Sequence, residues 1–200
     1  MKRIFFILII ALISLHSFGQ NEWELQKSED NIDVFFRQSS EHKYDIKVVT
    51  GFNISHQDLM SVLYDIEHYP AWVYRCETAT WLNKKNGERV MYSITDIPWP
   101  FNDRDIITKM QKPEYKNQKV ILRSVALPDY IPPKEGLTRQ DFSQVTWIIS
   151  TDDDKSTRVT YLLSLEITEN IPEFILKMIT TKGPYESFKN LHNLISPKTN

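Results

Sequence analysis

The chain has 200 residues, 41% of them hydrophobic and 25% charged, and a formal net charge of −2 at pH 7. This length fits one domain with a core of its own. The absence of a basic excess excludes the charge profile of a nucleic-acid-binding protein. Cys76 is the only cysteine, so no internal disulfide forms, and we expect a buried, inert thiol.

The first nineteen residues have the layout of a secretory signal peptide. Lys2 and Arg3 precede an apolar run from residue 4 to residue 15, and small residues suit cleavage after Gly19. A membrane anchor is the alternative, but the run is shorter than the ~20 apolar residues that cross a bilayer. We therefore expect residues 1–19 to be removed, residues 20–200 to form one domain, and the protein to be exported, either periplasmic or secreted.

Strand signals dominate the middle of the chain. Branched and aromatic residues between polar breaks predict strands over residues 32–37, 44–54, 89–97, 106–110, 119–127 and 145–150. From Val159 onward, apolar residues take the odd positions and mostly polar residues the even ones, as in a half-exposed strand. Short connections between these segments favour a largely antiparallel sheet.

Two segments have helical periodicity. Ser55 suits the N-cap of a helix that Pro70 is expected to end. Apolar residues recur at spacings of three and four over residues 171–195, where Lys182-Gly183-Pro184 predicts a kink or break. The elements together predict an α+β architecture in which a curved antiparallel sheet buries its apolar face against a long C-terminal helix. A solid core and a sheet curled around a cavity both fit this pattern.

The segment from Tyr92 to Asp105, which reads YSITDIPWPFNDRD, resembles the signature of StAR-related lipid-transfer (START) domains. Further pieces follow in the family's order, namely Tyr69-Pro70-Ala71-Trp72, Cys76-Glu77, Leu137-Thr138-Arg139, Ile171-Pro172 and Lys182-Gly183-Pro184-Tyr185. The resemblance covers nearly the whole chain after the expected signal peptide. Two departures stand near the end, where Glu169-Asn170 replaces Asp-Gly-Gly and Glu173-Phe174 replaces a tryptophan.

The resemblance implies a helix-grip fold of the Bet v 1-like superfamily, with a curved antiparallel sheet wrapped around the C-terminal helix and an internal hydrophobic cavity. It implies a monomer that binds, and in some members transfers, a lipid, sterol or similar ligand, with transient membrane contact and with no cofactor, metal or nucleic acid. The sequence carries none of the common catalytic motifs, so we expect no enzyme activity. The alternatives are a helix-grip cyclase or hydrolase, and a ligand-gated interaction module.

The resemblance also assigns site residues. It places Arg104 in the cavity and pairs it with Glu77, because a buried charge needs a partner; the alternative is a local pair with Asp103, Asp105 or another surface acid. Further ligand contacts are predicted for strand residues Tyr92, Ile94, Leu122, Trp147, Tyr161 and Leu163, and for helix residues Met178 and Tyr185.

Two loops receive predictions as well. Residues 127–136 match the family's omega loop, and we expect them to form a lid together with the helix around Met178 and Tyr185. A rigid connection stiffened by prolines is the alternative. Trp99, between two prolines, is expected to pack a corner between strands.

Overall fold

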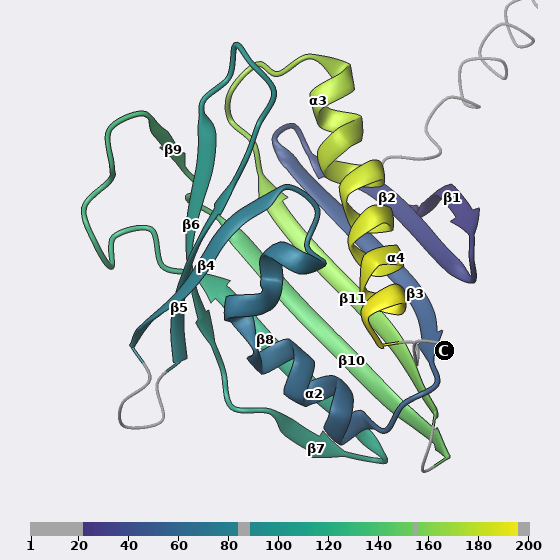
Figure 1. Ribbon diagram of the computed structural model, residues 1–200. Coiled ribbons are helices and arrows are strands. Elements are labelled where there is room, and N and C mark those ends of the chain that lie inside the picture. Colours follow the sequence, from purple (N-terminus) through teal and green to yellow (C-terminus); the bar gives the residue numbers. More distant parts are fainter. Residues whose placement is uncertain (1–21, 84–88, 154–155, 196–200) are drawn as a thin grey trace, which may run out of the picture.

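The computed structural model describes residues 22–83, 89–153 and 156–195, and the expected signal peptide lies outside these ranges. A strongly bent sheet of 11 strands dominates it, in the order β1-β2-β3-β11-β10-β8-β6-β5-β4, with β7 beside β8 and β9 beside β6 (Figure 1). The strands are β1 (Glu24–Glu29), β2 (Ile32–Ser40), β3 (Lys43–Phe52), β4 (Cys76–Asn83), β5 (Arg89–Thr95), β6 (Asp103–Met110), β7 (Glu114–Lys116), β8 (Lys119–Ala126), β9 (Leu137–Arg139), β10 (Ser143–Asp153) and β11 (Ser156–Glu166). Only the short β6–β9 pair is parallel among the described strands. The predicted strands and the antiparallel sheet are confirmed.

The first helix, α2 (His56–Tyr64), covers one end of the concave face (Figure 1). Ser55 caps it as predicted, because its Oγ accepts a backbone N–H of the first turn at 3.1 Å. The helix ends before Pro70, however, which lies inside a following 3₁₀ helix, η1 (Ile66–Ala71). The phenol of Tyr69 donates to a carbonyl of the last turn of α2 at 2.7 Å. This bond satisfies a free carbonyl at the helix end and stabilises the early stop.

The C-terminal helix crosses the concave face beside β2, β3 and β11 (Figure 1). It comprises α3 (Glu173–Lys177), a π-helical turn η3 (Met178–Lys182) and α4 (Gly183–Ile195) without interruption. The helix therefore does not break at Lys182-Gly183-Pro184, and a π-helical turn directly precedes Gly183 instead. The wider turn joins the Gly183 N–H to the Met178 carbonyl five residues earlier, and so accommodates the proline that follows. No helix in the described ranges has the length and hydropathy needed to cross a bilayer.

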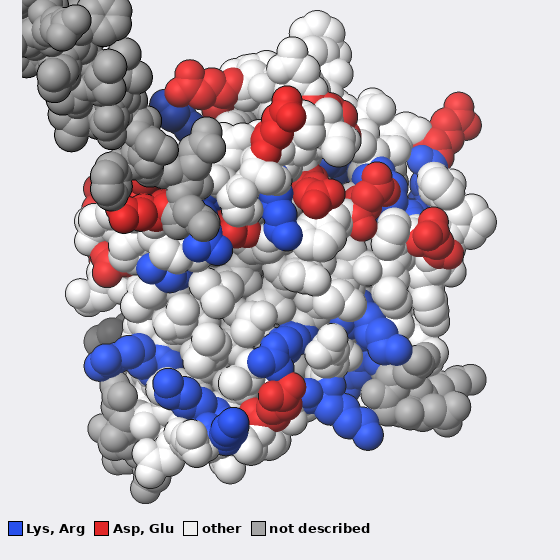
Figure 2. Space-filling model, turned by 180° about the vertical axis from the view of Figure 1, so that it is seen from behind, with Lys and Arg blue, Asp and Glu red and all other residues white. Residues whose placement is uncertain are grey.

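The two faces of the sheet differ. At the α2 end, the concave face is a filled core that contains Phe52, Leu59, Leu63, Val120, Leu122 and Ile149. On the outer face, basic side chains gather toward one end and acidic side chains toward the other (Figure 2). Cross-strand pairing brings exposed Lys116, Lys119 and Arg158 close together at one end of β8, β10 and β11.

Candidate ligand-binding cavity

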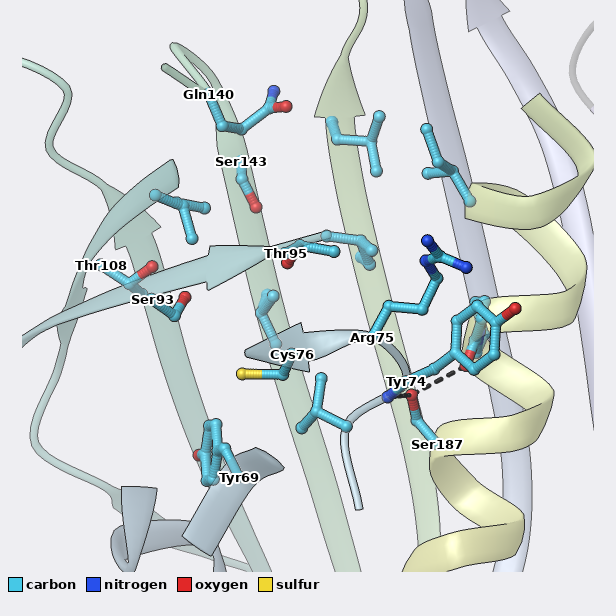
Figure 3. Close-up of a pocket in the computed structure, with 18 of the residues that line it drawn as sticks. Tyr69, Tyr74, Arg75, Cys76, Ser93, Thr95, Thr108, Gln140, Ser143 and Ser187 are labelled. Atoms are coloured by element: carbon cyan, nitrogen blue, oxygen red, sulfur yellow. Dashed lines mark hydrogen bonds between the residues drawn. The ribbon is translucent and has the colours of Figure 1, made fainter. Parts of the chain in front are cut away.

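A cavity of about 330 Å³ lies between the concave face and the C-terminal helix, at the end that α2 does not fill (Figure 3). Three groups of residues form its walls. The strands contribute Met91, Ser93, Thr95, Arg104, Ile106, Thr108, Met110, Ser124, Ser143, Val145, Trp147, Tyr161, Leu163 and Leu165. The helix contributes Met178, Ile179, Gly183, Pro184, Ser187 and Phe188. The corner after η1 contributes Tyr69, Trp72, Val73, Tyr74, Arg75 and Cys76, and Ile97, Gln140 and Ile167 complete the lining.

One wall is aromatic and rigid. Trp147 and Tyr161, paired across β10 and β11, meet edge to face with ring centroids 4.9 Å apart, and each lies 5.4 Å from the ring of Phe188. Burial raises the pKa of the Tyr161 phenol far above its ordinary value, so it stays neutral. These rings join the filled core to the cavity and offer a flat apolar surface to a ligand.

The corner after η1 is tied to the helix. The N–H of Tyr74 donates to Ser187 Oγ at 2.9 Å, and that hydroxyl donates to the Gly183 carbonyl at 2.8 Å (Figure 3). Cys76 lies on the same corner, and burial raises the pKa of its thiol to about 11. The expectation of a buried thiol is confirmed.

Arg104 reaches the cavity from β6, but its partner is not Glu77. Its side chain is 17% exposed and forms an ion pair with Glu169 at 2.7 Å and a hydrogen bond to Gln140 Oε1 at 3.2 Å. Gln140 is itself held by two carbonyl groups, at 2.7 and 2.8 Å. Glu77 is exposed on β4, and its carboxylate lies beside those of Asp96 and Asp103. The predicted pair is wrong because Glu77 is a solvent-exposed residue at the edge of the sheet.

The pair gives Glu169 an unusual environment. Partial burial alone would raise the pKa of its carboxyl group, but the hydrogen bond and positive charge of Arg104 outweigh this and hold the pKa below its ordinary value. Both groups of the ion pair are thus charged at neutral pH. Arg104 contributes a compensated charge to the cavity rim rather than a free cation.

Five of the ten predicted site residues line the cavity, namely Arg104, Trp147, Tyr161, Leu163 and Met178. Tyr92 and Ile94 instead face the outer side of β5, because Met91, Ser93 and Thr95 face inward and side chains alternate along a strand. Leu122 does face inward, but in the filled core at the α2 end.

Tyr185 lies on a different side of the helix from the cavity. Its hydroxyl donates to Asp30 at 2.7 Å, and Lys189 forms an ion pair with the same carboxylate at 3.0 Å. The ring packs under Lys27, whose Nζ lies 4.0 Å from its centroid. Tyr185 therefore fastens α4 to the β1–β2 hairpin rather than contacting the cavity.

The loop over residues 127–136 does not cover the cavity. Its apolar residues Leu127 and Ile131 pack against Tyr92 on the outer face of the sheet. Arg139 holds the loop there, through paired 2.9 Å bonds to buried Asp105 and bonds to three loop carbonyls. The alternative of a rigid connection fits this arrangement, and the predicted lid does not.

Trp99 does not pack a corner, because its side chain is 90% exposed. The polar cavity residues Ser93, Thr95, Thr108, Ser124 and Ser143 were not predicted. For Ser93 and Thr95, the apolar neighbours Tyr92 and Ile94 had been assigned to the cavity instead. Only the strand pairing shows that these hydroxyls point to the inside.

Comparison with known proteins supports the fold. No protein-family model matches the sequence. A protein of Pseudomonas aeruginosa described as uncharacterized is 24% identical over 173 residues, which is 86% of each chain. A STAR-related lipid transfer protein fragment from Xanthomonas axonopodis superposes with a TM-score of 0.76 at 22% identity, over 86% of this chain and 98% of that one. Human STARD10 gives 0.71 at 21% identity, over 92% and 76%.

An enzyme shares the architecture more distantly. The Zhui aromatase/cyclase from Streptomyces sp. R1128 has a TM-score of 0.54 at 11% identity, over 77% of this chain and 94% of that one. These similarities, together with the bent sheet and the C-terminal helix, show that the chain has the START-type helix-grip fold. The α+β fold expected from the sequence is confirmed.

Proposed function

We propose that this protein binds one hydrophobic small molecule, such as a lipid, in the cavity and does not transform it. The cavity of about 330 Å³ between sheet and helix is the observation that carries this proposal. Concave sites of this size, mostly apolar with a few placed polar groups, are where proteins hold small ligands. The STAR-related lipid transfer protein fragment named above shares the fold and supports the same class of ligand.

The chemistry of the lining supports a container rather than an enzyme. Among the described residues that line the cavity there is no histidine, aspartate or glutamate to act as a general acid or base. The thiol of Cys76 has a pKa of about 11, so little thiolate is present at neutral pH. A cyclase or hydrolase on the same fold is the alternative, and conversion of an extracted ligand by the purified protein would establish it.

The proposal extends to the setting in which the ligand is bound. We propose an exported monomer that exchanges its ligand through transient membrane contact. N-terminal sequencing of the protein from its native cells tests export, with a mature chain that begins at Gln20 as the expected result.

The direct test is native mass spectrometry of the protein from its own cells, followed by organic extraction. A bound apolar molecule at one equivalent is expected. In parallel, Val145→Phe fills the cavity, whereas Thr146→Phe on the same strand points outward. We expect the first change to weaken binding of the neutral dye Nile red at least about tenfold and the second to leave it unchanged. Equal binding by both variants would place the dye elsewhere and contradict the proposal.

A further inference from the structure

Four small hydroxyl side chains on neighbouring strands form one wall of the cavity. Ser93 on β5, Thr108 on β6, Ser124 on β8 and Ser143 on β10 are each only 7–8% exposed, and all four line the cavity. Figure 3 shows Ser93 beside Thr108, with Ser143 and Thr95 on the same sheet side. These uncharged hydroxyls are set among the apolar lining residues Met91, Ile106, Met110 and Val145.

None of these four hydroxyls makes a hydrogen bond to any residue that the structure describes. Their polar neighbours in the lining differ in this respect. Ser187 and Gln140 each make two side-chain bonds or more, and Arg104 has its ion pair. Buried hydroxyls normally have partners, and these four oxygens are open to the cavity rather than enclosed by protein atoms. Four on one wall therefore indicate partners supplied from within the cavity.

The hydrogen-bonding capacity of the four hydroxyls indicates which chemical groups can pair with them. A serine or threonine hydroxyl both donates and accepts, so it pairs with hydroxyl, carbonyl or ether oxygens. It does not compensate a buried charge. The nearest cations, Arg75 and Arg104, already form ion pairs with Asp96 and Glu169. The groups that face the hydroxyl wall are accordingly neutral.

The aromatic wall and the volume restrict the ligand further. Trp147, Leu163, Phe188 and Ile179 line the cavity beside the hydroxyls and offer only carbon surface, apart from the indole N–H. A volume of about 330 Å³ stands at the lower end of the ~300–1,000 Å³ range of small-molecule sites. A compact ligand with oxygen atoms along one edge and carbon along the other matches both walls.

We propose that the cavity selects compact, neutral ring compounds that carry several oxygen functions along one edge, in preference to plain hydrocarbons. This inference rests on the proposed function, because it requires that the cavity is the ligand site. A pure hydrocarbon would fill the same space but would leave all four hydroxyls without partners.

Two probes with one carbon skeleton test the preference. Trans-stilbene and 3,5-dihydroxystilbene differ only in two hydroxyl groups on one ring of the second compound. These phenol groups stay uncharged at pH 7 because phenols ionise near pH ~10. Each is titrated against Nile red bound to the full mature protein. We expect the dihydroxy compound to displace the dye at about tenfold lower concentration, as two modest hydrogen bonds would give.

A double variant removes part of the wall. Ser93→Ala with Thr108→Val should reduce the preference to about threefold or less while keeping stilbene binding. Thr146→Val with Ser150→Ala, on the outer face, is the matched control and should keep the tenfold preference. Should the first pair fail to fold by circular dichroism, Ser143→Ala alone tests the same wall.

The outcomes separate the two proposals. Displacement of Nile red by both stilbenes at equal concentration, or a preference unchanged in the double variant, would overturn the hydroxyl wall and leave the container function standing. Binding of neither the dye nor the stilbenes would overturn the container function, and this inference with it.

Discussion

The two ends of the concave face are formed by the same strands, but one end is a packed core and the other is a cavity. On β8, Val120 and Leu122 fill the core under α2. Ser124, two residues further along and on the same face, lines the cavity. On β10, Ile149 is core and Val145 is cavity wall. Alternation along the strands is identical at both ends. Side-chain size, and the helix that covers each end, therefore decide which end is solid and which is hollow.

The largest expected effect is a difference in the unfolding free energy lost by the same substitution at the two ends. Leu122→Ala opens a void in a tightly packed region and should cost about 3 kcal/mol of unfolding free energy. Leu163→Ala, the same change on a strand that borders the cavity, should cost roughly half as much because part of that side chain already lacks neighbours. Urea unfolding at constant m-value measures both. Equal losses would mean that the hollow end is as solid as the filled one.

A smaller effect tests how the helix passes over the hollow end. A Cβ on Gly183 would stand 2.9 Å from the Met178 carbonyl oxygen and 3.5 Å from the ring of Tyr74. Gly183→Ala should therefore destabilise the protein by about 1–2 kcal/mol, although alanine normally favours a helix. Leu194→Ala, at a half-exposed site on the same helix, serves as control and should change stability by less than about 0.5 kcal/mol. A stabilised Gly183→Ala variant would show that the π turn has room to spare.

The smallest effect concerns the rim of the cavity and depends on pH. Because the folded-state pKa of Glu169 lies below the ordinary value of 4.5, the unfolded chain takes up this proton first as pH falls. The pair thus stabilises the protein fully above that value, and the contribution disappears as pH falls through the folded-state pKa. It should amount to less than about 1 kcal/mol, because the Glu169 side chain is 45% exposed to screening solvent.

Glu169→Gln should remove this part of the pH dependence of urea unfolding between pH 3 and pH 6. Glu77→Gln is the matched control, and it distinguishes the observed partner of Arg104 from the one expected from the sequence. If Glu77→Gln removed the acid dependence instead, the pairing in the structure would be contradicted.

The sequence predicted the strands well because period-two alternation is a local property. It misplaced Tyr92 and Ile94 because β5 is covered on both faces: Val90 and Tyr92 are buried under the loop of residues 127–136, while Met91 and Ser93 face inward. A strand that is buried on both sides carries no reliable polarity signal. The assumption that apolar residues point inward then assigned the wrong face.

The partner of Arg104 escaped prediction for a different reason. Glu169 is 65 residues away in the sequence, in the segment where the chain departs from the family pattern. No periodicity connects a strand to a loop over that distance, so only the folded arrangement could show the pair. The Glu169-Asn170 pair that departs from the family pattern thus supplies the carboxylate that binds Arg104.

The position of Cys76 has a practical consequence. The chain's single thiol stands in the cavity wall, so a chemical label attached there would occupy the space of a ligand. Covalent modification and ligand occupancy should exclude each other in every molecule. The raised pKa leaves little thiolate at neutral pH, so modification would be slow, and its rate should fall further when a ligand fills the cavity.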